Sequence, residues 1–269
     1  MVYEAEGVSA EKITALFAAL GGLGALLPVE VGNATVVLKP NFCLPDPPER
    51  ATTTSPFVID LLCRYLIAGG VRRIIIADHT LNAGTAFDKH RLFDLPREFP
   101  EVKVVLANEE RMYEPVEVKG KVLESVSSMK LLARADLLIN LPAAKHHSAT
   151  HVSLGVKNLM GVIWNRSDFH TKMDLAQAIG DLATVIRPAL TIVDASRVLL
   201  TGGPTGPGKV VAGERLFASR DVVAVDAVVV SRYNFGDKSV SPMDVAHLRA
   251  AAANGVGELD LAKITVRKV

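Results

Sequence analysis

Five short, uninterrupted apolar runs constrain the fold of this chain more than any other feature of its sequence. They occupy residues 34–40, 72–78, 102–107, 136–142 and 190–195. Strands that are buried on both faces read as continuous apolar runs, whereas strands with one wet face alternate. We therefore expect a layered α/β fold, with a largely parallel or mixed sheet and helices on both faces.

Segments with helical patterns lie between these runs or follow them. Helices are expected over residues 9–20, 56–68, 127–135, 173–186, 222–233 and 243–255, and further strands over residues 215–220 and 263–269. The hydroxyl residues 52–55 precede Pro56 and favour a capped helix start, although a helix N-terminus can also receive an anion. The order of strands and helices is that of a doubly covered sheet.

The length and composition of the chain indicate an ordinary globular protein. Its 269 residues can bury a sizeable core, and we expect a single α/β domain over residues 1–269, with an N-terminal helical extension over residues 1–30 as a variant of this reading. Hydrophobic residues make up 49% of the chain, charged residues 22%, and the net charge is +1. This balance provides no basic field to hold nucleic acid.

The N-terminal residues also bear on the expected location. They lack the basic start of a secretory signal, and their apolar run is broken by glycines and too short to span a membrane. We therefore expect a cytoplasmic protein with neither a nucleic-acid nor a membrane partner. Homo-oligomerisation is left open.

Cysteine usage limits the cofactors. Cys43 and Cys63 are the two cysteines, and neither belongs to a CxxC pair, so we expect no iron–sulfur cluster held by this chain. Cys63 lies in an apolar helix pattern, which predicts a buried thiol. Cys43 lies in a loop after Lys39, where a nearby ammonium group can lower its pKa, but a structural role is favoured.

Polar side chains gather where the predicted strands end. The first strand ends in Lys39 and Asn41, and the second in Asp78, His79 and Thr80. Asn140 and Lys145 end a later strand, and Asp194 ends another. The carboxyl ends of parallel strands form the crevice in which α/β proteins bind ligands, so these side chains are expected to converge. The alternative is a set of solvated loop residues, because strand ends are polar in every α/β protein.

Residues 141–170 are the densest in chemistry, since they hold four of the seven histidines together with Lys145 and Lys157. If residues 148–158 were helical, His147 and His151 would share one face, as two metal ligands do. No glutamate of an HExxH motif lies between them, so a zinc protease is excluded. Metal binding and hydrogen bonding to an anion both stay open for these histidines.

Several motifs in order carry a resemblance to a known family. They are VVLKPNF with the ATTTSP helix start, IIIADHT, ADLLINLPAAKHH, LGVKNLMGVI with a downstream FH, LTIVDA, GGPTGPG and SRDVVAVDAV, between residues 34 and 260. The chain resembles the family called domain of unknown function 362. This resemblance implies an α/β fold but no settled activity, and many members carry ferredoxin-like cysteine clusters that this sequence lacks.

The resemblance also implies a set of site residues. By position, the polar residues of the family motifs fall on Lys39, Asn41, Asp78, Lys145, His147, Lys157, Asn158, His170, Asp194 and Asp226. Three lysines from separate segments repel one another and lose hydration when gathered, unless an anion neutralises them. We therefore expect a carboxylate or phosphate as the ligand.

Two further segments of the sequence could contact such a ligand. The loop over residues 202–208 is rich in glycine and proline, which suits either a rigid turn or a close backbone approach to a phosphate. It is not a Walker A motif, because the Lys-Ser/Thr ending is missing. Residues 164–166 lie between Lys157 and His170, where either a mobile flap or a packed loop fits.

Two hypotheses about function follow. The first is an enzyme for a small anionic substrate, in which His147, His170 and Lys145 are catalytic. Its substrate-binding residues are expected to be Lys39, Asn41, Asp78, Lys157, Asn158 and Asp194. The alternative is a non-catalytic protein that carries a metal or metallocofactor, or assists a redox partner, and lacks the cysteine clusters of its relatives. No metal ligand is assigned, and the identity of any cofactor stays unknown.

Overall fold

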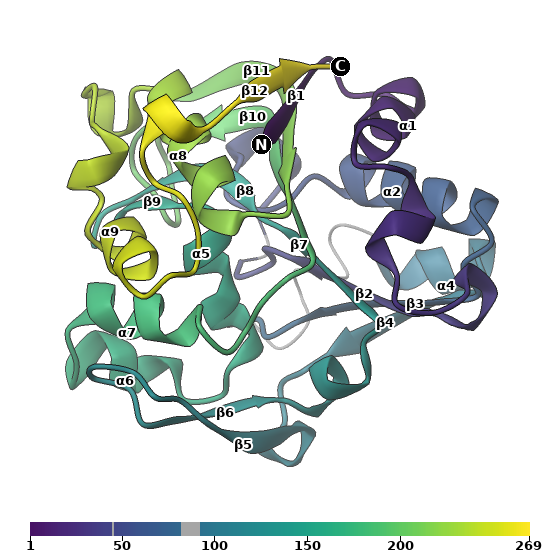
Figure 1. The fold of residues 1–269 in the computed structure, drawn as a ribbon, viewed down its shortest axis with the longest axis horizontal. Helices are drawn as coiled ribbons and strands as arrows, with labels where there is room; N and C mark the ends of the chain where they lie inside the picture. Colours follow the sequence, from purple (N-terminus) through teal and green to yellow (C-terminus); the bar gives the residue numbers. More distant parts are fainter. Residues whose placement is uncertain (45, 82–91) are drawn as a thin grey trace.

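A computed structural model describes residues 1–44, 46–81 and 92–269, and one large sheet runs through it (Figure 1). Its order is β12-β1-β11-β10-β7-β2-β3-β4, and the hairpin β8-β9 attaches to β10. The strands are β1 (Val2–Glu6), β2 (Thr35–Pro40), β3 (Arg73–Asp78), β4 (Val102–Leu106), β7 (Leu137–Leu141), β8 (Ala143–His147), β9 (His151–Ser153), β10 (Leu190–Leu199), β11 (Val210–Ser219) and β12 (Val266–Lys268).

The sheet is mixed, with a parallel half and an antiparallel half. β2 pairs in parallel with β3 and β7, β3 with β4, and β7 with β10. β11 pairs antiparallel with both β10 and β1. The ends of β2, β3 and β7 therefore open at one edge, as the sequence predicted for the crevice.

Helices cover both faces of this sheet (Figure 1). They are α1 (Ala10–Ala19), α2 (Pro56–Ala68), α4 (Leu95–Glu98), α5 (Gly155–Asn158), α6 (Arg166–Thr171), α7 (Leu175–Leu182), α8 (Val222–Arg232) and α9 (Ala246–Ala253). The side chains of α1 and α2 form one apolar core with one face of the sheet, and those of α5, α7, α8 and α9 form a second core with the other. The predicted α/β layering is confirmed.

Some elements differ from the expected ones. The predicted helix over residues 127–135 is wrong, because β6 (Ser125–Met129) pairs there with β5 (Tyr113–Glu117), and a 3-10 turn, η6 (Lys130–Arg134), follows. The helix expected over 173–186 shortens to α7, and the strand expected over 263–269 to β12. These elements depend on distant pairing partners, which local sequence patterns do not report.

β1 is a strand that the sequence analysis did not predict. It joins the main sheet by pairing antiparallel with β11 and parallel with β12, before α1 begins. α1 itself starts where expected, because the Ser9 side chain accepts a hydrogen bond from the backbone N–H of Lys12. Among the described residues, no helix is long and apolar enough to cross a membrane.

Candidate functional site

A cavity of about 590 Å³ opens at the carboxyl ends of β2 and β3. It is bordered by the ends of these strands, by β8, by α5 and α6, and by the loop that follows β10. Eight of the nine predicted site residues line it: Lys39, Asn41, Asp78, Lys145, His147, Lys157, Asn158 and His170. Segments that are far apart in the sequence therefore meet in one cavity of the size usual for small-molecule sites.

Lys39 and Asp78 form a buried ion pair at the base of the cavity. Lys39 Nζ lies 2.6 Å from Asp78 Oδ1, and the two side chains are 2% and 4% exposed. Asp78 Oδ2 also accepts the backbone N–H of Phe42 at 2.7 Å. Burial lowers the pKa of Lys39, and the charge of Asp78 opposes this shift. The charge of Lys39 is thus neutralised within the protein.

Gly161 leaves the space that this ion pair occupies. A Cβ atom at this position would lie 2.5 Å from Lys39 Nζ and 2.7 Å from Asp78 Oδ1. Both distances are shorter than real side-chain contacts allow, so glycine is required here for close approach.

Lys145 ends a chain of side-chain hydrogen bonds that runs through three asparagines. Its Nζ donates to Asn41 Oδ1 at 3.0 Å, and Asn41 Nδ2 donates to Asn158 Oδ1 at 2.9 Å. Asn158 Nδ2 then donates to Asn140 Oδ1 at 2.8 Å, and Asn140 Nδ2 donates to the Gly155 carbonyl at 3.0 Å. This asparagine chain joins β8, β2, α5 and β7 and fixes the direction of each amide.

Lys145 has further carbonyl acceptors. Its Nζ donates to the carbonyl of Thr52 at 2.6 Å and to that of Pro204 at 3.4 Å. Burial lowers the pKa of Lys145 to about 8. These oxygens are neutral, so they position the ammonium group without cancelling its charge.

Lys157 is less well accommodated than Lys145. Its buried Nζ has a polar contact at 3.1 Å with the sulfur of Met160, and no hydrogen-bonding oxygen within the described residues. Burial, together with nearby Lys145 and Arg166, lowers the pKa of Lys157 to about 8. An ammonium group in this position lacks the partner that buried charges require.

Asp226 holds the short helix that carries Lys157. Its two carboxylate oxygens accept the backbone N–H groups of Gly155 and Val156, each at 2.8 Å. Burial raises the pKa of Asp226 to about 7. Asp226 does not line the cavity, so the structure gives this family position a supporting role at the start of α5.

His147 is neutral and has a defined tautomer. Burial, assisted by Lys157 and Lys145, lowers its pKa to about 3. Its Nδ1 accepts the backbone N–H of Ala149 at 3.2 Å, so the ring proton belongs on Nε2. His170 is more exposed than His147, and partial burial followed by the charge of Lys157 lowers its pKa as well. His147 therefore presents a hydrogen-bond donor, and His170 a neutral imidazole.

His79, Arg166 and Cys43 were given no catalytic or substrate-binding role from the sequence, yet all three line the cavity. His79 Nδ1 lies 3.4 Å from the carbonyl of Ile163, which leaves Nε2 as the acceptor, and its ring stacks on Trp164. Arg166 donates to the carbonyl of His79 at 3.1 Å. The position of His79 directly after Asp78 is the sequence signal that could have identified it.

His146, His151 and His247 are not part of the lining of this cavity. Residues 148–158 do not form one helix, because His147 and His151 pair across the β8-β9 hairpin. The condition under which these two histidines would share a helical face is therefore not met. His146, His151 and His247 line a separate, smaller cavity of about 320 Å³. The two ring nitrogens of His247 are buried without a partner among the described residues. In the described ranges, no three His, Cys, Asp or Glu side chains lie close enough together to form a metal site.

Asp194 lies outside the cavity, contrary to the expectation that it binds substrate. It is fully buried, and its carboxylate accepts the backbone N–H of Ser55 at 2.7 Å and that of Ser196 at 3.0 Å. Ser55 is the N-cap of α2, but its own side chain makes no capping bond. Asp194, on the distant strand β10, therefore provides the hydrogen-bond acceptor for a backbone N–H group at the start of α2.

The glycine-proline loop over residues 202–208 does reach the cavity. Pro204 and Thr205 line it, and the loop packs against the β8-β9 hairpin through a hydrogen bond from the N–H of Ser148 to the carbonyl of Gly203. A Cβ atom on Gly203 would lie 1.8 Å from the carbonyl oxygen of His146. The glycine permits this close packing.

The family model described as Domain of unknown function (DUF362) matches residues 36–231. The chain belongs to this family. A thylakoid-associated protein of Synechocystis sp. is 25% identical to this DUF362 protein over 234 residues, which are 84% of this chain and 70% of the relative. The match with the family confirms the resemblance seen in the sequence motifs.

Two solved structures match this chain with low TM-scores. The lactate racemase apoprotein from Thermoanaerobacterium thermosaccharolyticum matches with a TM-score of 0.46 and 15% identity, over 93% of this DUF362 chain and 56% of the racemase. A protein from Thermotoga maritima matches with a TM-score of 0.37 and 13% identity, over 71% of this chain and 51% of that one. The chain thus spans about half the length of these structures.

Proposed function

We propose that this DUF362 protein binds a small anion, a carboxylate or a phosphate, in the lysine-lined cavity and moves a proton to or from it. The charge of the described lining supports this proposal. Lys39, Lys145, Lys157 and Arg166 bring four cations into the cavity, and Asp78 brings one carboxylate, which Lys39 already engages. Lys157 without an oxygen partner is the observation that carries the proposal.

The residues around this charge divide into binding and proton-transfer groups. Lys157 and Arg166 would bind the anion by charge, and Lys145 would add a positioned ammonium group. The Nε2–H of His147 would donate to an oxygen on which charge develops during the reaction. His170 is neutral near pH 7 and would accept a proton.

Two further points belong to this proposal, a cytoplasmic location and a non-catalytic alternative function. A cytoplasmic location stays part of it, although one relative is named for its association with thylakoids. The non-catalytic metal carrier is tested by elemental mass spectrometry of the purified protein and of a His147→Ala, His170→Ala double variant. A stoichiometric metal that disappears in the variant would favour the carrier over the anion-binding enzyme.

Cys43 provides a direct test of the anion site, because its partly exposed thiol lines the same cavity. The rates at which anionic iodoacetate and neutral iodoacetamide alkylate Cys43 can be followed by mass spectrometry. A cationic cavity concentrates the anionic reagent, so we expect a higher iodoacetate-to-iodoacetamide rate ratio than that of a free thiol such as glutathione. Inorganic phosphate or malonate should slow both reactions.

Matched controls separate charge from general reactivity. Cys63 is buried, and burial raises the pKa of its thiol to about 12, so it should not react in the folded protein. Lys157→Met should lower the rate ratio and weaken protection by phosphate, whereas Lys172→Met on the surface should not. A rate ratio equal to that of glutathione, with no protection by either anion, would contradict the proposed site.

The proton-transfer half of the proposal needs its own assay. Wild-type protein is incubated in D₂O with a panel of 2-oxo and 2-hydroxy carboxylates, and loss of the carbon-bound proton is followed by NMR. If the wild-type protein catalyses exchange of the carbon-bound proton of one of these compounds for deuterium, His170→Gln should not catalyse it. Anion binding without exchange of any panel member would remove the enzymatic part of the proposal.

A further inference from the structure

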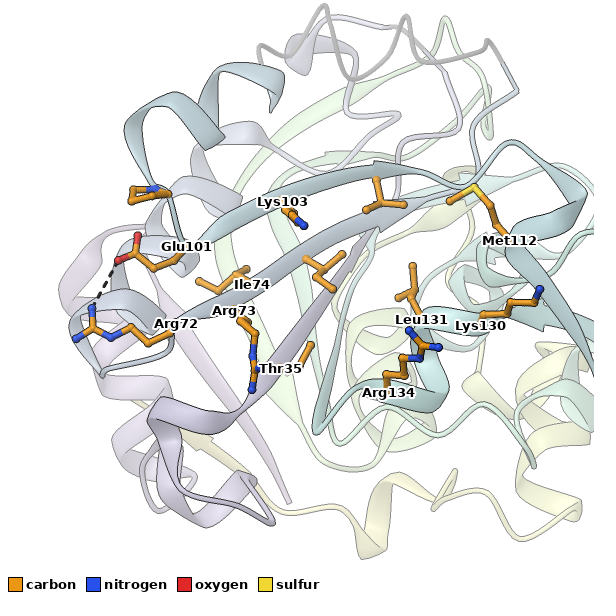
Figure 2. Close-up of a pocket in the computed structure, with 13 residues that line it drawn as sticks. Thr35, Arg72, Arg73, Ile74, Glu101, Lys103, Met112, Lys130, Leu131 and Arg134 are labelled. Atoms are coloured by element: carbon orange, nitrogen blue, oxygen red, sulfur yellow. Dashed lines mark ion pairs between the residues drawn. The ribbon is translucent and has the colours of Figure 1, made fainter.

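A second cavity of about 560 Å³ lies near the amino-terminal ends of β2 and β3, whereas the proposed anion site opens at their carboxyl ends. It is formed by the amino-terminal halves of β2 and β3 and by Lys103 and Val105 of β4 on one side, and by the 3-10 turn η6 on the other (Figure 2). None of its described lining residues is shared with the first cavity. Its volume lies within the range of about 300–1,000 Å³ that is usual for small-molecule sites.

The floor of this second cavity is apolar and incompletely covered. Ile75 and Val105 come from the sheet, Leu131 from η6 and Met112 from the turn before β5. Each of these side chains is partly exposed within the described structure. An apolar ligand that covered them would remove this hydrophobic surface from water, which favours binding in proportion to the apolar area buried.

The rim is strongly basic. Exposed side chains of Arg72, Arg73, Lys103, Lys130 and Arg134 surround the floor. The one acidic residue in the described lining, Glu101, lies 3.7 Å from Arg72 and so leaves the other four cations without a carboxylate (Figure 2). Lys130 donates to a backbone carbonyl and Arg73 to that of Asn33. Arg134 points into the space between η6 and the sheet (Figure 2).

We propose that this second cavity binds a linear fatty acid, with the acyl chain on the apolar floor and the carboxylate at Arg73 and Arg134. The two halves of the cavity match the two halves of such a ligand. An inorganic anion would leave the floor exposed, and a neutral hydrocarbon would leave the positive charge of the rim without a counter-charge. An arginine fork binds a carboxylate through two parallel hydrogen bonds, which fixes the head group at the rim.

Calorimetric titration of the full chain with dodecanoate, below its micelle concentration, tests the proposal. We expect saturable one-to-one binding that weakens about tenfold or more in Arg73→Ala/Arg134→Ala, which removes the head-group site, and likewise in Leu131→Asp, which places a negative charge on the floor. Arg97→Ala is the matched control, because Arg97 is an 84% exposed cation on α4 outside the cavity. Its affinity should equal that of the wild type.

Comparison ligands and a variant of the first site complete the test. Dodecyltrimethylammonium and acetate should each bind at least about tenfold more weakly than dodecanoate, because the first has the wrong charge and the second has no chain. Lys157→Met should leave dodecanoate binding unchanged. The proposal is overturned if Lys157→Met abolishes binding, if the cationic detergent binds equally well, or if an acidic peptide binds here and dodecanoate does not.

Discussion

Replacing Lys157 with methionine is expected to stabilise the ligand-free protein at neutral pH, because burial of this ammonium group opposes folding. Burial lowers the pKa of Lys157 from 10.5 to about 8. One pKa unit corresponds to about 1.4 kcal/mol, so keeping this lysine protonated in the fold costs about 3 kcal/mol. Methionine keeps the aliphatic stem and removes the charge, so the free energy of unfolding should rise by up to this amount.

The stability gained by Lys157→Met should decrease as the pH rises. The pKa of Lys157 is lower in the folded protein than in the unfolded chain, so between about pH 8 and pH 10.5 the unfolded chain binds more protons. Wild-type stability therefore rises across this window, while that of Lys157→Met lacks this contribution. The free-energy cost of burying protonated Lys157 is fully present below about pH 8. The difference in unfolding free energy between the two proteins should nearly vanish at about pH 10.5.

Urea denaturation of both proteins at about pH 7 and about pH 10.5 measures this difference. Lys145→Met is the matched contrast, since burial lowers the pKa of Lys145 to the same value of about 8. Lys145 Nζ, however, donates to oxygens of Asn41, Thr52 and Pro204, which methionine would leave without a donor. We expect no gain for Lys145→Met. Equal behaviour of the two variants, or a gain for Lys157→Met that is the same at both pH values, would refute the reasoning.

Urea denaturation of three further variants tests packing and hydrogen bonding at Gly161, Asp194 and His247. Gly161→Ala should destabilise the protein by about 1–3 kcal/mol, because the added methyl group would displace the Lys39–Asp78 pair. If the variant were as stable as the wild type, the ion pair could move without cost. Asp194→Ala should cost about 2 kcal/mol through loss of the α2 cap, whereas Asp194→Asn should cost less; equal losses would exclude capping. His247→Leu should be neutral or stabilising, because both ring nitrogens are buried without a described partner, and a loss above about 2 kcal/mol would reveal a hidden partner.

The convergence of the site residues was predictable because it follows from topology. Lys39 and Asp78 end strands that read as buried apolar runs, and parallel pairing of β2 with β3 places those ends side by side. Lys157 and His170 were included because residues 141–170 concentrate lysines and histidines and because the family motifs fall on both positions.

What could not be predicted depends on partners far away in the sequence. Asp194 looks like any other polar strand end, and its capping role requires Ser55, which lies 139 residues away. The β8-β9 hairpin contains few β-branched residues and is held by pairing of β8 with β10, so its sequence alone also fits a helix. Arg166 reaches the cavity because α6 places it beside His79, 87 residues away in the sequence, which no periodicity encodes.

The asparagine chain has a consequence for how the charge in the cavity is kept in place. A lysine ammonium group can only donate and a backbone carbonyl can only accept, so the two ends of the chain fix all three amides between them. An aspartate at Asn158 would therefore fail, because it has no donor for Asn140. The polarity of the cavity is thus a property of assembled elements: β2, β7, α5 and β8 must all be docked before Lys145 has a single orientation.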